Sequence, residues 1–248
     1  GIPWARVADS RRAGAELAAA FFRHPSRELL LAGVTGTNGK TTTTFAIDSI
    51  LRAAGVASGV MGTLGYGPVH DLVEAPRTTP DAIELQSQLR RMADAGIGAL
   101  AIEVSSHALM LSRPWRCAFD VGVFTNLSQD HLDFHQDLDD YLEAKLLLFT
   151  EYPRQARPYK QMRAAINLDD EFGRRIARRA QCPVLGYGLG ADCDVRAVAV
   201  TSGGAGSDFD LLLPDARLHV QLRLPGAFNV YNALAAAAAA HAMGLDAE

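Results

Sequence analysis

The residues of this chain that are best suited to chemistry form a short glycine-containing segment, Gly36-Thr37-Asn38-Gly39-Lys40-Thr41. The segment follows an apolar stretch with strand character and precedes a stretch with helical character. Backbone N–H groups of such a turn, together with the N-terminus of the following helix, bind phosphate oxygens. A lysine in the place of Lys40 contacts the β- and γ-phosphates of a nucleotide, and a hydroxyl in the place of Thr41 binds Mg²⁺. The segment therefore predicts a phosphate-binding loop for a magnesium nucleotide.

The match is to a short GxxGKT form of this loop. Val34 stands where the longer GxxxxGK[ST] pattern has a glycine. An ordinary glycine turn between a strand and a helix is therefore the alternative. The run Thr41–Thr44 argues against that alternative, because four consecutive threonines are poor helix formers at the start of a helix. We expect a local function to compensate for them.

Two further residues, Glu103 and His131, are of types that can bind a metal ion. Glu103 follows an apolar segment, so its carboxylate is expected at the carboxyl edge of a sheet, where open α/β folds bind ligands. A hard oxygen ligand there suits Mg²⁺, and a solvated charge after a strand is the alternative. His131 lies in the acidic stretch Asp130–Asp133 and has, by its surroundings alone, the character of a surface residue.

Segments that alternate between strand and helix character connect these residues. The predicted strands are Leu29–Val34, Val56–Met61, Ala99–Val104, Phe119–Phe124, Ala164–Asn167 and Val184–Tyr187. The predicted helices are Thr41–Ala54, a helix from Pro80 to Gly96, Asp137–Thr150, Asp170–Ala180 and the alanine-rich Ala227–Met243. Such alternation indicates an α/β fold with a mainly parallel sheet flanked by helices. Beyond Gly190, three shorter strands predict a small antiparallel β-meander attached to this sheet: Val195–Val200, Asp208–Leu213 and Leu218–Leu224.

Local signals make three finer predictions. Thr79 is a natural N-cap with Pro80 at the first helical position, and the preceding stretch 62–79 is expected to be a loop. By periodicity, Lys145 lies on an amphipathic helix with its ammonium group in water. The alanines of the last helix are expected to pack closely against the sheet.

Composition argues against several classes of protein. A formal net charge of -4 does not favour a general nucleic-acid-binding surface. No apolar segment reaches the roughly 20 residues of a membrane-spanning helix, and the N-terminus lacks a signal-peptide pattern. Three cysteines (Cys117, Cys182 and Cys193) without CxxC spacing predict neither a disulfide framework nor a zinc site. Idle thiols suit a reducing cytosol, so we expect a cytoplasmic protein. We also expect a monomer without nucleic-acid or membrane partners.

Beyond the chemistry of single residues, the segment Gly33–Thr43 resembles the phosphate loop of the Mur ligase family. Three further blocks agree with the family in order and spacing: Glu103-Val104-Ser105-Ser106-His107, Phe124–Asp133 and Gly226-Ala227-Phe228-Asn229-Val230-Tyr231-Asn232. Thr78-Thr79-Pro80 and Glu143-Ala144-Lys145 make the similarity greatest to the MurE-type branch. The resemblance extends from about residue 28 to about residue 245, nearly the whole chain.

The resemblance implies an ATP site, two Mg²⁺ sites and an acceptor site. On the nucleotide side it implies Gly36, Thr37, Asn38, Gly39, Lys40, Thr41, Thr42, Asn126, Asn229 and Asn232. The implied metal ligands are Thr41, Glu103, His131 and Lys145, the last as a carbamate formed with CO₂. The implied catalytic residues are Lys40, Lys145 and His131, and the implied acceptor-binding residues are Thr78, Thr79, Ser105 and Arg113.

Some roles stay open at this point. Asn229 and Asn232 could equally cap the last helix, and His107 is a candidate to cap or orient the Ser105-Ser106 turn. Leu111 departs from the pattern, because some relatives carry a glutamine two residues before the arginine. Contacts on that side of the acceptor pocket are therefore undecided.

The function implied by the resemblance is ATP-dependent amide formation in peptidoglycan synthesis. A diamino acid, meso-diaminopimelate or L-lysine, is added to the small-molecule acceptor UDP-N-acetylmuramoyl-L-Ala-D-Glu (a UDP-MurNAc-dipeptide) through an acyl phosphate. Residues 1–27 are expected to be a remnant of an N-terminal UDP-binding domain with its linker, and residues 28–248 a central ATP-binding domain. The C-terminal domain is expected to be absent, and the chain alone inactive. The alternatives are another ligase of the superfamily, such as MurF or folylpolyglutamate synthase, and a non-catalytic nucleotide-binding module.

Overall fold

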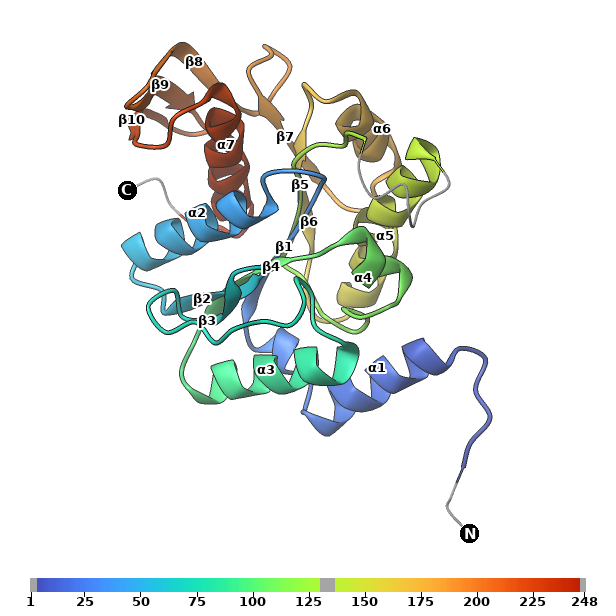
Figure 1. The fold of residues 1–248 in the computed structure, drawn as a ribbon. Coiled ribbons are helices and arrows are strands. Elements are labelled where there is room, and N and C mark those ends of the chain that lie inside the picture. Colours follow the sequence, from blue (N-terminus) through green and yellow to red (C-terminus); the bar gives the residue numbers. More distant parts are fainter. Residues whose placement is uncertain (1–3, 130–136, 246–248) are drawn as a thin grey trace.

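Seven α-helices, a short 3-10 helix and ten strands make up the described part of the chain, residues 4–129 and 137–245 of the computed structural model (Figure 1). The strands are β1 (Leu30–Thr35), β2 (Ser58–Gly62), β3 (Gly65–Gly67), β4 (Ala99–Glu103), β5 (Val121–Phe124), β6 (Arg163–Asn167), β7 (Val184–Gly188), β8 (Val195–Gly203), β9 (Gly206–Leu212) and β10 (Arg217–Leu222). The α-helices are α1 (Ser10–Phe21), α2 (Lys40–Ala53), α3 (Ala82–Asp94), α4 (Ser106–Met110), α5 (Leu138–Ala156), α6 (Glu171–Arg179) and α7 (Ala227–Ala242).

All ten strands form one sheet, in the order β10-β9-β8-β7-β6-β5-β1-β4-β2-β3. The strands β2, β4, β1, β5, β6 and β7 are parallel to one another, with β1 between β4 and β5. The central strands are buried on both faces, which is why they stand out in the sequence as continuous apolar segments. The predicted α/β fold with a mainly parallel sheet is confirmed.

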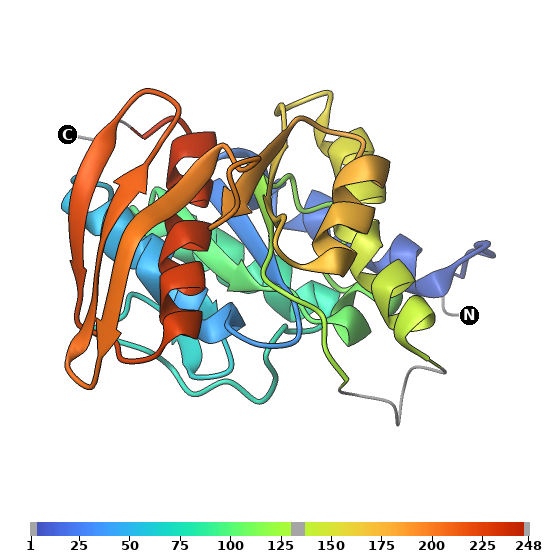
Figure 2. The same cartoon turned by 90° about the horizontal axis from the view of Figure 1, so that it is seen from above.

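Helices cover both faces of this sheet (Figures 1 and 2). Apolar side chains of α2 and α7 form one core with the inner residues of the sheet. Those of α3, α4, α5 and α6 form the other core. The alanines of α7 are buried against β5 to β8, as predicted, and their small side chains allow the helix to approach the strands closely.

The predicted antiparallel meander is present as β8, β9 and β10, and it continues the main sheet through a short parallel pairing of β8 with β7. One strand was not predicted. Gly65–Gly67 forms β3 within the expected loop 62–79 and pairs antiparallel with β2. Three consecutive positions with two glycines give no hydrophobic alternation from which a strand could be inferred.

The predicted start of α3 is wrong. Helix α3 begins at Ala82 with Asp81 in the N-cap position, two residues after the predicted N-cap Thr79. The Thr79 hydroxyl instead donates to the Glu103 carbonyl oxygen at 2.7 Å and accepts from the Ser105 N–H at 3.2 Å. A long-range contact with the end of β4 therefore replaces the local cap.

The other predicted helices are present, but some of them begin or end at different residues than predicted. α5 continues six residues past the predicted end at Thr150, to Ala156. Two helices, α1 and α4, were not predicted. None of the helices in the described ranges is both long enough and apolar enough to cross a bilayer.

Candidate active site

The glycine-containing segment connects β1 to α2 at the carboxyl edge of the sheet. β1 ends at Thr35, and α2 begins at Lys40. Because β1 pairs with β4 on one side and β5 on the other, the ends of those strands place Glu103 and Thr125 beside the segment. Open α/β sheets bind ligands at this edge, so the segment and Glu103 meet where phosphate and metal chemistry is expected.

Side chains that follow β5 hold this loop in shape. The Asn126 amide contacts the Asn38 backbone twice, accepting from its N–H at 2.9 Å and donating to its carbonyl oxygen at 3.1 Å. The Thr125 hydroxyl donates to the same carbonyl at 2.7 Å. In this structure the amide of Asn126 therefore supports the loop backbone, whereas the resemblance assigned it to the nucleotide.

Two lysines converge on one carbonyl oxygen of the loop. Lys40 Nζ donates to Gly36 O at 3.0 Å and to Thr37 O at 2.8 Å, and Lys145 Nζ donates to Gly36 O at 2.9 Å. Lys145 also lies over the Tyr141 ring, 4.1 Å from its centroid. The loop thus has two cationic groups at the position expected for bound phosphate.

The prediction that the Lys145 ammonium group lies in water is wrong. Lys145 is only 1% exposed, and its neighbours on α5 are equally buried. Lys145 lies on the same side of α5 as Tyr141 and Leu148, and this buried side brings its ammonium group to the phosphate loop. A buried ammonium is costly unless it is hydrogen-bonded, and such costs are common at functional sites.

Glu103 is the carboxylate nearest the loop. It is 1% exposed, and its Oε1 accepts from the Thr41 hydroxyl at 2.9 Å and from the Thr63 N–H at 3.0 Å. Gly62 leaves the space for it, because a Cβ there would lie 2.1 Å from Glu103 Oε1. The alternative of a solvated charge is therefore excluded.

The pair of Thr41 and Glu103 fits the chemistry of Mg²⁺. This cation prefers oxygen ligands and is commonly held by one or two carboxylates together with substrate phosphates and water. Within the described residues no group of three or more His, Cys, Asp or Glu side chains could hold a metal alone. One hydroxyl and one carboxylate beside a phosphate loop are the ligand set expected for a nucleotide-bound cation.

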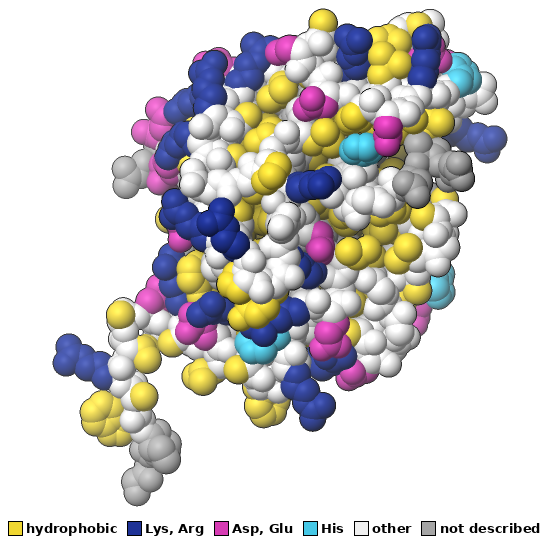
Figure 3. Space-filling view, turned by 180° about the vertical axis from the view of Figure 1, so that it is seen from behind, with side chains coloured by type: hydrophobic (Ala, Val, Ile, Leu, Met, Phe, Trp, Pro, Cys, Tyr) yellow, Lys and Arg dark blue, Asp and Glu magenta, His cyan; other side chains and the backbone are white. Residues whose placement is uncertain are grey.

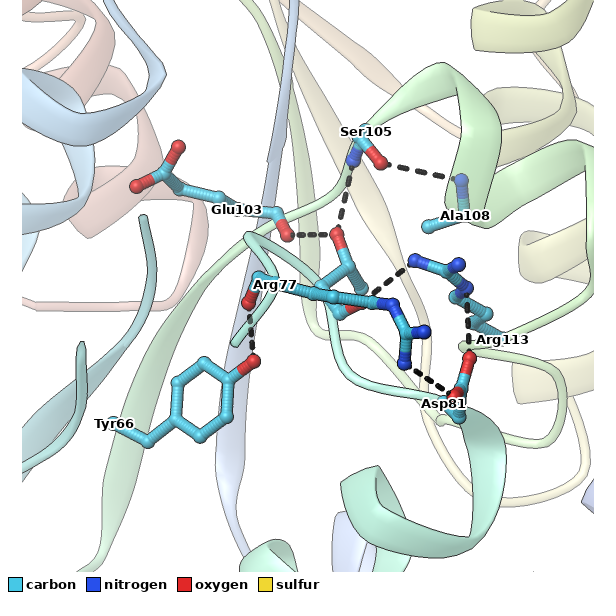
Figure 4. A network of polar contacts seen from close by, with 8 residues as sticks. Tyr66, Arg77, Asp81, Glu103, Ser105, Ala108 and Arg113 are labelled. Atoms are coloured by element: carbon cyan, nitrogen blue, oxygen red, sulfur yellow. Dashed lines mark hydrogen bonds and ion pairs between the residues drawn. The ribbon is translucent and has the colours of Figure 1, made fainter. Parts of the chain in front are cut away.

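On the other side of Glu103, the predicted acceptor residues form a polar network (Figure 4). Arg113 NH1 donates to the Thr79 carbonyl oxygen at 3.0 Å, and the Thr78 and Thr63 hydroxyls are 3.0 Å apart. Ser105 caps α4, since its Oγ accepts from the Ala108 N–H at 3.2 Å. The cap of this turn is therefore Ser105, whereas the candidate of the sequence analysis was His107.

A cavity of about 690 Å³ joins the loop to this network. It is lined by Gly36–Thr41, Thr63, Arg77–Thr79, Glu103, Ser105–His107, Arg113, Tyr141 and Lys145. Among the described lining residues, four side chains are lysine or arginine and one is a carboxylate. On the outer face shown in Figure 3, by contrast, basic and acidic side chains are interspersed. The cavity is therefore a local concentration of positive charge in a chain with a formal net charge of -4.

A second cavity, of about 680 Å³, lies on the opposite side of the loop. Asn126, Thr42 and Asn232 line it together with Tyr231, whose hydroxyl donates to Asp169 at 3.0 Å. Burial, reinforced by Asp169, raises the pKa of Tyr231 to about 12, so the phenol keeps the proton that it donates. This cavity is the second space that a nucleotide on the loop can enter.

Asn229 does not line this second cavity. It holds Asn232, whose Nδ2 donates to Asn229 Oδ1 at 3.0 Å, and it donates to the Pro225 carbonyl oxygen at 2.8 Å. Sequence reasoning missed Asp169, although it follows β6 at the same sheet edge as Glu103. The predicted ligand His131 lies outside the described residues.

A further cavity, of about 770 Å³, is lined mainly by apolar side chains and lies between α2, α7 and the meander. Thr41 and Thr42 are its contacts with the phosphate loop. It has none of the convergent polar groups that catalysis needs, so the two smaller cavities form the candidate site.

Comparisons with known proteins agree with this geometry. The profile of the Mur ligase middle domain matches residues 34–240. The chain is 44% identical over 247 residues to the UDP-N-acetylmuramoyl-L-alanyl-D-glutamate--2,6-diaminopimelate ligase of Geobacter sulfurreducens, covering 99% of this chain and 48% of that relative. The chain thus spans about half the length of the curated relatives it matches.

Solved structures give the same result. A structure of a UDP-N-acetylmuramoyl-L-alanyl-D-glutamate--2,6-diaminopimelate ligase superposes with a TM-score of 0.83 at 32% identity, covering 95% of this chain and 48% of that one. MurF from Acinetobacter baumannii superposes with a TM-score of 0.72 at 23% identity, covering 97% and 48%. The second likeness shows a shared fold alone.

Proposed function

Because the chain belongs to the Mur ligase family, we propose that it is the ATP-binding core of an ATP-dependent ligase in peptidoglycan synthesis. The proposed reaction adds a diamino acid to UDP-N-acetylmuramoyl-L-alanyl-D-glutamate. The names of the relatives specify 2,6-diaminopimelate as the amine, and L-lysine is the alternative amine.

One contact carries the proposal. The Thr41 hydroxyl at the start of α2 donates to the Glu103 carboxylate at the end of β4, at 2.9 Å. Both residues line the cationic cavity, at the point where the phosphate loop meets it. The pair supports a magnesium nucleotide whose terminal phosphate faces an anionic acceptor in that cavity.

The reaction proceeds in two steps. A carboxylate oxygen of the acceptor D-glutamate attacks the γ-phosphorus of ATP, ADP leaves, and an acyl phosphate forms. The amine then attacks the acyl carbon, phosphate leaves, and the nitrogen loses a proton. Lys40 and the loop N–H groups would neutralise charge on the phosphoryl oxygens while Arg113 holds the acceptor. Thr41 and Glu103 would hold Mg²⁺, which would supply further positive charge beside the phosphoryl oxygens.

Calorimetric titration of ATP with Mg²⁺ into the 248-residue chain tests the nucleotide site. We expect Mg²⁺-dependent binding that Lys40→Ala weakens about tenfold or more, because a hydrogen bond to a charged group contributes about 1.5–3 kcal/mol. Arg91→Ala removes a charge from the exposed side of α3 and is the matched control. Equal binding by Lys40→Ala and the parent chain would show that the loop is not the phosphate site.

The acceptor is tested separately with a panel of ligands. The proposal expects the UDP-N-acetylmuramoyl dipeptide to bind in preference to the corresponding tripeptide and to a folate. Preference for the tripeptide would favour a MurF-type reaction, and preference for the folate a folylpolyglutamate synthase.

We propose in addition that Lys145 is carbamylated in the active protein and holds a second Mg²⁺ together with His131. In this step the neutral amine attacks CO₂, an N–C bond forms, and a proton is released. Burial beside Gly36 O supports the proposal, because the product would face the phosphates. Carbon-13 NMR of the chain with labelled bicarbonate is expected to show a carbamate resonance that Lys145→Met lacks. An identical spectrum from both proteins would rule the modification out.

The division of the chain is also a proposal. We assign residues 28–248 to an ATP-binding domain and residues 1–27 to the end of a UDP-binding domain with its linker. In support, residues 1–27 precede the region that the family profile matches, which begins at residue 34. We further propose a cytoplasmic monomer, in which the free thiols of Cys117, Cys182 and Cys193 suit a reducing compartment.

A further inference from the structure

Two arginines at the acceptor end of the cavity share a single carboxylate. Arg77 NH1 lies 2.7 Å from Asp81 Oδ2, and Arg113 Nε lies 3.1 Å from Asp81 Oδ1 (Figure 4). Arg77 comes from the loop before α3, Asp81 from the N-cap position of α3, and Arg113 from the segment after α4. Both arginines line the cavity and Asp81 does not, so the Asp81 carboxylate pairs with them outside the cavity lining.

The two guanidinium groups still have donors to offer. Within the described part of the chain, Arg77 uses only NH1 in an ion pair or hydrogen bond, which leaves Nε and NH2. Arg113 donates from NH1 to the Thr79 carbonyl oxygen, and its buried Nε lies 3.1 Å from Asp81 Oδ1 as an ion pair without a hydrogen bond, which leaves NH2 for a ligand. One carboxylate between two guanidinium groups also leaves the cluster with a net positive charge.

We propose that Arg77 is a second anion-binding residue of the acceptor site and that Asp81 positions it together with Arg113. The acceptor class that fits is a dicarboxylate, with one carboxylate on each guanidinium group. The proposal rests on the proposed function, since it concerns the acceptor of the same reaction.

The physical argument is one of orientation. A guanidinium group binds a carboxylate well only when its planar fork faces it. Arg77 is half exposed, with 51% of its side chain accessible, so without a partner it would sample many rotamers. Asp81 restricts this freedom at the cost of some positive charge. If orientation matters more than charge, removing the Asp81 carboxylate weakens acceptor binding; if charge matters more, its removal strengthens binding.

The experiment uses the 248-residue chain and three probes: N-acetyl-L-alanyl-D-glutamate and its two mono-amides, each with one carboxylate replaced by a carboxamide. Binding is followed by nitrogen-15 NMR, in which the Nε–H signals of Arg77 and Arg113 report on the guanidinium groups themselves. We expect Arg77→Gln to weaken binding of the diacid about tenfold and to leave the affinity for one mono-amide unchanged, because that probe lacks the carboxylate that Arg77 binds. Arg77→Lys keeps the charge but is expected to restore only part of the affinity.

The direction in which Asp81→Asn changes the affinity for the diacid distinguishes the two roles of Asp81. We expect the substitution to weaken binding of the diacid by about threefold or more, whereas a purely electrostatic role for Asp81 predicts tighter binding. Arg91→Gln on the exposed side of α3 is the control for charge, and melting curves of all variants exclude loss of folding.

Two results overturn the inference: equal weakening of the diacid and both mono-amides by Arg77→Gln, or tighter binding by Asp81→Asn. Binding of ATP with Mg²⁺ separates these failures from failure of the proposed function. A chain that binds ATP through Lys40 but lacks Arg77-dependent selectivity contradicts the inference alone. A chain that shows the selectivity but binds no nucleotide contradicts the proposed function alone.

Discussion

Glu103→Gln is expected to weaken Mg²⁺-dependent binding of ATP by about a hundredfold while leaving the fold intact. The amide keeps the shape of the side chain and an oxygen that accepts from the Thr41 hydroxyl and the Thr63 N–H, so the contacts within the protein survive. It lacks the negative charge, however, and Mg²⁺ is held mainly by anionic oxygen ligands. The loss should therefore appear only when Mg²⁺ is present.

Calorimetry with and without Mg²⁺ measures this difference directly. Gly62→Ala is the geometric counterpart, because its Cβ would lie 2.1 Å from Glu103 Oε1 and the carboxylate must move while its charge is unchanged. We expect the same Mg²⁺-specific loss from this variant. If Glu103→Gln weakened ATP binding equally in the presence and absence of Mg²⁺, the carboxylate would act on the shape of the loop and not on the metal.

The position of Glu103 was predictable from the sequence because one simple rule covers it. Strands of a parallel sheet that are buried on both faces are apolar throughout, so β1, β4 and β5 could be recognised and their carboxyl ends placed together. A polar residue at the end of such a strand, or within two residues after it, then lies at the edge of the sheet where ligands bind. The same rule would have found Asp169 after β6, had it been applied there.

Residues whose roles depend on long-range contacts were not predictable in this way. A lysine on a helix is expected to keep its ammonium group in water, whereas the packing of α5 against the phosphate loop buries that of Lys145. Thr79 has the local signature of a helix cap, but the end of β4 competes for its hydroxyl. Arg77 carries no pattern at all, because its significance depends on sharing Asp81 with an arginine 36 positions away in the chain.

The phosphate loop itself depends on such a contact, between Gly39 and the last helix. Gly39 occupies the N-cap position of α2 with φ of 84°, a conformation that favours glycine. A Cβ at this position would lie 2.2 Å from Oδ1 of Asn232, which α7 holds in a buried position. The motif that contains Asn232 therefore acts on the shape of the loop as well as lining the second cavity.

Gly39→Ala is accordingly expected to lower the free energy of unfolding by about 3 kcal/mol, from a left-handed alanine (about 1–2 kcal/mol) and a collision in a packed interior (about 1–3 kcal/mol). It should also weaken ATP binding by more than about a hundredfold, because the loop N–H groups no longer point at one phosphate position. Denaturant unfolding and calorimetry measure the two effects. Gly55→Ala is the matched control, since Gly55 follows the other end of α2 with φ of 76°, and a Cβ added there would have no atom within 4 Å.

A double-mutant cycle then separates the collision of a Cβ at position 39 with Asn232 from the backbone strain at position 39. Asn232→Ala removes the atoms that a Cβ at position 39 would meet, so the double variant should be about 1–2 kcal/mol more stable than the sum of the single effects. Strain at position 39 would remain, at about the cost measured for Gly55→Ala. Additive effects would mean that α7 does not press on the loop. A coupling of the expected size, together with partly recovered ATP affinity, would mean that Asn232 serves the nucleotide site by shaping the backbone that binds phosphate.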